Sequence, residues 1–111
     1  LQDELLKYGP VIETDEMFPN RINVQFAKVI NRSLVEIRIW ERGVGNTLAS
    51  GSSSCAVASA MRKNNLVDSN VIIRMPGGEL SIFIDDNWNI RMTGPVQEIA
   101  TGKFSQEMIN N

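Results

Sequence analysis

The sequence contains no histidine and only one cysteine, Cys55, among its 111 residues. A single cysteine excludes an intramolecular disulfide and a cysteine-rich zinc site. Without histidine, the chain also lacks the side chain that most often acts as a general base near neutral pH. The carboxylates are not clustered as metal ligands would be, so we expect neither a metal nor another cofactor. A lone thiol suits a reducing compartment, and we expect the protein in the cytoplasm.

The chain also lacks long apolar runs and an excess of one charge. Eleven basic residues stand against thirteen acidic ones, which gives a net charge of −2. This balance provides no electrostatic attraction to nucleic acid or to an anionic membrane, and no stretch approaches the roughly 18 apolar residues of a membrane span. The composition, 42% hydrophobic, is ordinary for a globular protein. The length indicates a single domain over residues 1–111.

Alternating apolar residues and turn signals predict an α+β fold. Alternation on both sides of a turn at residues 31–33 predicts a β-hairpin from Ile22 to Trp40. Residues 52–63 predict a helix, which begins with serines, ends with basic residues and has no charge in its middle. Because a helix without a polar face is typically enclosed, we expect this one to be buried.

The remaining elements complete the predicted architecture. They are a short helix over residues 1–8, closed by Gly9-Pro10, and strands over residues 71–75, 79–84, 88–92 and 96–104. Together the elements predict a curled, antiparallel-rich sheet of about seven strands that wraps one central buried helix.

Residues 40–55 combine the groups that a small charged ligand needs. Glu41 and Arg42 end a strand, a glycine loop follows, and Ser50-Gly51-Ser52 opens the helix. N–H groups at a helix N-terminus bind carboxylates or phosphates. Arg42 could bind a second carboxylate through two hydrogen bonds, and Glu41 could accept from an ammonium group. The pattern predicts a site for a small zwitterion with acidic ends.

Each of these features also has an ordinary structural explanation. Serines before a helix are most often caps, a Glu-Arg pair at a strand end is most often solvated, and Cys55 in a small-residue helix is most often an inert core thiol. A purely structural domain therefore stays an alternative, although the Glu-Arg and glycine motifs have no evident packing purpose.

Four separated motifs resemble the diaminopimelate epimerase family. Residues 40–55 are similar to the family's Glu-Arg-Gly-x-Gly-x-Thr followed by Ala-Cys-Gly-(Ser or Thr)-Gly-x-Cys. Residues 18–24, 75–78 and 92–95 match Phe-Pro-x-Arg-x-Asn-Val, Leu-Pro-Gly-Gly and Met-Thr-Gly-Pro in the same order. The resemblance implies two similar halves with the active site between them. This chain resembles the C-terminal half, and the cysteine motif of the N-terminal half is absent from it.

The resemblance implies an isomerase that interconverts LL- and meso-diaminopimelate in bacterial lysine and cell-wall precursor synthesis. In the family, two cysteines on opposite faces of the α-carbon move the proton, without a metal or another cofactor. Arg42 would bind the distal carboxylate, Glu41 the distal ammonium, and Asn23 would hydrogen-bond the distal end. The N–H groups of Gly51 and Ser52 would hold the reacting α-carboxylate.

Ser50 occupies the position of the family's catalytic cysteine, whereas Cys55 matches a cysteine that is not catalytic. A serine hydroxyl is hardly ionised near neutral pH and a thiol of pKa about 8.5 is poised near it, so Ser50 predicts a poorer base. Ser50 could be native and active, as in hydroxyproline epimerases of this fold. It could be native in a paralogue with changed chemistry, such as a silent amino-acid binder, or it could be an engineered substitution.

The substrate and partners follow from the same resemblance. Retention of Asn23, Glu41 and Arg42 favours diaminopimelate, and a racemase of another amino acid, such as histidine, is the closest alternative. The expected partners are the amino-acid substrate and the missing N-terminal half, with no nucleic acid and no membrane, and a homodimer stays open. Alone, the chain is expected to fold, to expose an apolar face where the other half docks, and to be inactive.

Overall fold

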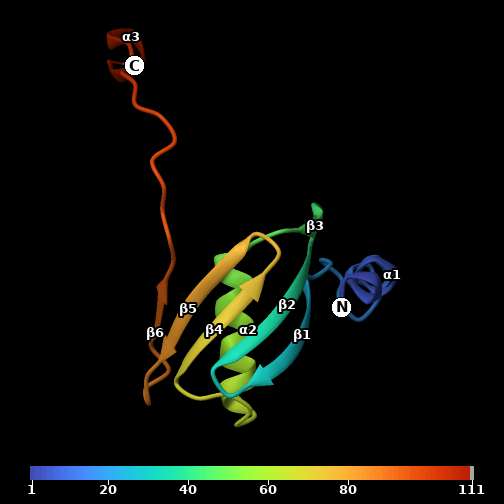
Figure 1. Cartoon of the computed structure of the whole chain (residues 1–111). Helices are drawn as coiled ribbons and strands as arrows, with labels where there is room; N and C mark the ends of the chain where they lie inside the picture. Colours follow the sequence, from blue (N-terminus) through green and yellow to red (C-terminus); the bar gives the residue numbers. More distant parts are fainter. Residues whose placement is uncertain (111) are drawn as a thin grey trace.

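The structure, a computed structural model, describes residues 1–110 and confirms the α+β fold (Figure 1). Within these residues, six strands form one mixed sheet, and the longest helix packs against one of its faces. The helices are α1 (Gln2–Glu13), α2 (Gly51–Lys63) and α3 (Gln106–Ile109). The strands are β1 (Val24–Asn31), β2 (Leu34–Glu41), β3 (Gly45–Thr47), β4 (Asn70–Met75), β5 (Gly78–Ile84) and β6 (Ile90–Thr93).

The sheet has the strand order β1-β2-β4-β5-β6, and β3 pairs with the end of β2. The predicted hairpin is β1–β2, in which Val24 lies opposite Trp40. Strands β2 and β4 are parallel because α2 carries the chain back along the sheet between them. The glycine segment after Arg42, expected to interrupt regular structure, instead includes strand β3, which lies antiparallel to Ile39–Glu41. This return brings the chain directly to the head of α2.

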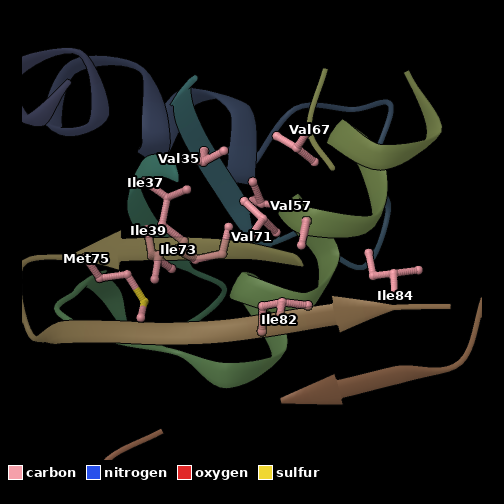
Figure 2. Packing of buried hydrophobic residues seen from close by; sticks show 11 residues of the cluster. Val35, Ile37, Ile39, Val57, Val67, Val71, Ile73, Met75, Ile82 and Ile84 are labelled. Carbon is pink, nitrogen blue, oxygen red and sulfur yellow. The ribbon is translucent and has the colours of Figure 1, made fainter. Parts of the chain in front are cut away.

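The hydrophobic core lies between α2 and the sheet. Alternate side chains of β2, namely Val35, Ile37 and Ile39, are fully buried and belong to one cluster with Val57 of α2. Figure 2 shows these side chains gathered between the helix and the strands. Burying a side chain of this kind contributes about 1.5–3 kcal/mol, so this cluster fixes how α2 sits on the sheet.

The expectation that α2 is buried on all sides is wrong. Ser53, Ser54, Val57 and Ala58 are buried, whereas the opposite face of the helix, which carries Ser52, Ala56 and Ala60, is exposed. The sheet covers only one side of α2.

Helix α1 does not end at Gly9-Pro10 as predicted but continues to Glu13. Gly9 is buried against Trp40 of β2, where an added Cβ would lie 2.8 Å from the indole Cγ. Close packing on Trp40, rather than a helix stop, therefore accounts for this glycine. The continued helix carries Glu13 to the loop that follows β2.

The strand predicted over residues 96–104 is also wrong. Residues 94–105 have no strand partner and leave the sheet as an extended tail that ends in α3 (Figure 1). Strand pairing requires a neighbouring backbone, and the tail has none in residues 1–110. Val96 and Ile99 are consequently 98% and 96% exposed.

The helices over residues 1–110 are too short or too polar to cross a membrane.

Candidate active site

Ser50 is the N-cap of α2 and is held by several hydrogen bonds. Its backbone is extended (φ −157°), and its Oγ accepts from the Ser53 N–H at 3.2 Å. Its carbonyl accepts from the N–H of Ser54 at 3.1 Å and from the Ser54 hydroxyl at 2.8 Å. One lone pair of the Ser50 hydroxyl is therefore committed to the cap, which is the ordinary role of a serine at this position.

The next two amides, of Gly51 and Ser52, are available to a ligand. At a helix N-terminus the first N–H groups have no partner within the helix, and no hydrogen bond in residues 1–110 uses these two. Ser52 is exposed, and its hydroxyl lies 3.2 Å from that of Ser50. N–H groups without a partner, at the end of a helix that carries partial positive charge, are groups of the kind that can bind a carboxylate.

A hollow of about 260 Å³ lies beside Ser50. Its wall opposite the helix is the turn between β4 and β5, where the Gly77 N–H donates to the Leu48 carbonyl at 2.8 Å. An added Cβ at Gly77 would lie 3.0 Å from both that carbonyl oxygen and the Ala49 Cβ. The residues that line the hollow are Ala49, Ser50, Gly51, Met75, Gly77, Gly78, Glu79, Leu80 and Pro95.

Replacing Gly77 with alanine is expected to lower the free energy of unfolding by about 1–2 kcal/mol, because the backbone of residues 48–49 must move to relieve the overlap. The midpoint of urea unfolding measures this change. Gly102→Ala is the matched control, since an added Cβ there meets no atom within 4 Å. Equal midpoints for the two variants would show that the turn does not press on the segment before Ser50.

A second group of polar residues lies where β2 ends. Asn23 Oδ1 accepts from the Arg42 N–H at 2.7 Å, and the Val44 N–H donates to the Glu41 carbonyl at 3.0 Å, which closes a tight turn. Arg42 is exposed, and its Nη1 donates to the Asn20 carbonyl at 3.3 Å. The structure thus brings Asn23, Glu41 and Arg42 together, with a cationic and an anionic side chain on one turn.

Glu13 supports the same turn, and sequence analysis missed it. Its side chain is buried. Oε2 accepts from the Gly43 N–H at 2.8 Å and Oε1 accepts from the Trp40 indole at 2.9 Å. Arg21 Nη1 lies 3.5 Å from Oε2. A glutamate 30 positions before Gly43 in the sequence carries no local signal of this contact.

These contacts predict how stability depends on pH. The hydrogen bonds from Gly43 and Trp40, in that order, lower the pKa of the Glu13 carboxyl below its ordinary value of 4.5, although desolvation opposes them. A carboxyl whose pKa is lower in the folded state stabilises the fold at any pH above its unfolded-state pKa. This stabilisation is lost as the pH falls through the folded-state pKa. Urea midpoints measured from pH 6 downward should fall below about pH 4.5 more steeply in the unaltered chain than in Glu13→Gln. Parallel curves would contradict the prediction.

Gln25 connects the two polar groups. Gln25 lies on β1, two residues after Asn23, and its Nε2 donates to the Ser53 hydroxyl at 3.0 Å. The Ser53 N–H in turn donates to the Ser50 hydroxyl. The chain at the start of β1 therefore contacts the turn after β2 through Asn23 and the first turn of α2 through Gln25. Sequence alternation placed Gln25 on a strand but could not show which helix residue it meets.

Cys55 is not placed to act in the role that a cysteine at position 50 would have. It lies a turn further along α2, partly buried against the hydrophobic core. Burial raises the pKa of its thiol, which disfavours the thiolate needed for nucleophilic or basic chemistry. No three His, Cys, Asp or Glu side chains in residues 1–110 come together as they would around a metal ion.

Comparison with known proteins finds the family description "Diaminopimelate epimerase" matched over residues 1–99. The chain belongs to the diaminopimelate epimerase family. It is 52% identical over 101 residues to diaminopimelate epimerase 2 of Nostoc sp., a match that covers 91% of this chain and 35% of that protein. The diaminopimelate epimerase of Pelagibacter ubique is 46% identical, over 86% of this chain and 35% of that protein. The diaminopimelate epimerase of Geobacillus sp. is 41% identical, over 86% of this chain and 34% of that protein.

The chain therefore spans about a third of the length of the diaminopimelate epimerases that it matches. The names of these relatives support an epimerase, which is an isomerase, and give no support to a histidine racemase or to an amino-acid binder without activity. Family membership confirms the resemblance inferred from the four sequence motifs.

Proposed function

We propose that this chain is the C-terminal half of a cytoplasmic, cofactor-independent enzyme that interconverts LL- and meso-diaminopimelate by proton transfer at the α-carbon. The observation that carries the proposal is the turn at residues 41–44. Asn23 binds the backbone of Arg42, and the side chains of Glu41 and Arg42 leave the same turn. A carboxylate and a guanidinium so placed complement the ammonium and carboxylate at the distal end of diaminopimelate.

The head of α2 serves the reacting end of the substrate. The free N–H groups of Gly51 and Ser52 would hold the α-carboxylate and stabilise the negative charge that grows when the α-proton leaves. Ser50, at the adjacent position, would face the α-carbon. Because this chain contains no histidine to activate the hydroxyl, the N-terminal half would supply the stronger proton-transfer group.

The exposed apolar side chains of the tail support docking of an N-terminal half. Val96 and Ile99 are almost fully exposed, and Phe104 is 74% exposed. Soluble proteins rarely leave such a stretch of apolar side chains in water. The tail together with the open hollow beside Ser50 would form the surface against which the other half closes.

Deuterium exchange at the α-carbon tests the proposed activity. The full-length protein of which this chain is a part would be incubated in heavy water with diaminopimelate and a panel of other amino acids, and followed by proton NMR. Exchange confined to diaminopimelate is the expected result. Exchange on a different amino acid would overturn the substrate. Binding of diaminopimelate without exchange would overturn the proposed activity and favour a silent binding paralogue.

A further inference from the structure

We propose that Glu13 is a positioning residue for the distal end of the substrate: its carboxylate holds the turn that presents Arg42. This inference rests on the proposed function, in which Arg42 binds the distal carboxylate. Glu13 does not itself reach that carboxylate, because both of its oxygens already accept hydrogen bonds from the protein. It acts through the backbone of residues 42–43.

The turn is held by two side chains at two consecutive amides. Asn23 accepts from the Arg42 N–H and Glu13 accepts from the Gly43 N–H, at 2.7 and 2.8 Å. Gly43 has φ +76°, a conformation that L side chains rarely adopt. Both N–H groups are bonded, and the Val44 N–H is donated to the Glu41 carbonyl, so three hydrogen bonds hold the backbone that carries Arg42.

The location of Glu13 is poorly explained by the stability of α1 alone. It is the last residue of that helix, where the helix dipole disfavours a negative charge. Its side chain is buried, and burying a charge is unfavourable unless it is hydrogen-bonded and paired. Among residues 1–110, Glu13 meets that condition through Trp40 of β2, Gly43 of the turn after β2, and Arg21. Its hydrogen bonds are therefore made to the end of β2 and the turn that follows it.

Glu13→Gln isolates this role because glutamine has the same shape and only one acceptor oxygen. The NH2 group of the glutamine must face either the Gly43 N–H or the Trp40 N–H. Because both groups are donors, they repel each other and one of the two hydrogen bonds is lost. Calorimetry of the full-length protein should show diaminopimelate binding weakened about tenfold. Binding of lysine, which is diaminopimelate without one carboxylate, should change less than twofold. Glu4→Gln, an exposed glutamate on the same helix, should change neither affinity.

The outcomes separate this inference from the function on which it rests. If the unaltered protein does not bind diaminopimelate, the proposed function fails. If it binds and Glu13→Gln binds equally well, the positioning role is overturned. A purely structural role would weaken diaminopimelate and lysine alike, and this result would also overturn it. Should Glu13→Gln not fold, Glu13→Asp takes its place: the shorter side chain draws the carboxylate away from Gly43, and the same selective loss is expected.

Discussion

Replacing Arg42 with alanine is expected to weaken diaminopimelate binding by the full-length protein about 100-fold, because a guanidinium that binds a carboxylate through two charged hydrogen bonds is removed. Arg42→Lys keeps the charge but loses the two-pronged geometry, so an intermediate loss of about tenfold is expected. Lysine has no distal carboxylate, and its affinity should be unchanged in both variants. Calorimetry with the two amino acids measures the difference.

The control for this prediction is Arg91→Ala. Arg91 is an exposed residue of β6, so the variant removes the same charge from a surface away from the turn at residues 41–44. It should leave both affinities unchanged. If Arg42→Ala weakens lysine as much as diaminopimelate, the turn is a general structural element of the site and does not read the distal carboxylate.

Replacing Ser50 with cysteine is expected to raise the rate of α-carbon deuterium exchange on diaminopimelate at least 100-fold, since a positioned general base contributes about 10²–10⁴-fold. A thiol of pKa about 8.5 is partly ionised near neutral pH, and the N-terminus of α2 stabilises the thiolate further. The Ser50 hydroxyl is hardly ionised near neutral pH: the single N–H that its Oγ accepts from Ser53 favours an alkoxide only slightly, and this chain contains no histidine to take the proton.

Two controls accompany the cysteine variant. Ser50→Ala should exchange no faster than the serine form and should lose about 1 kcal/mol of stability with its cap. The isolated 111-residue chain should remain inactive with serine or cysteine at this position, because it supplies one face of a two-sided proton transfer. Equal exchange rates for the serine and cysteine forms would show that position 50 does not carry the proton.

Local sequence patterns predicted the parts of the fold that depend on local interactions. The β1–β2 hairpin and α2 follow from alternation, turn residues and capping, and each was placed to within about two residues. The candidate site was predictable because Glu41, Arg42 and Ser50 lie close together in the sequence around one glycine segment. Of the site residues predicted, only Asn23 comes from another motif, and its hydrogen bond to the Arg42 N–H, which the sequence did not predict, joins that motif to the loop.

The missed features depend on contacts between distant residues. Helix α1 continues past Gly9 because Trp40 packs against it, and Glu13 is informative only when its distance to Gly43 is known. In the same way, residues 96–104 were predicted as a strand, but whether a strand forms depends on a neighbour to pair with. Periodicity reports the preference of a segment and cannot report the presence of its partner.

Calorimetric titration of the unaltered full-length protein with diaminopimelate and with lysine tests the central claim most directly, because it requires no catalysis and separates the distal end from the reacting end. The account predicts that diaminopimelate binds at least 100-fold more tightly, since only it offers a carboxylate to Arg42. Equal affinities, or no binding of diaminopimelate, would contradict the claim that Asn23, Glu41 and Arg42 form a site for its distal end.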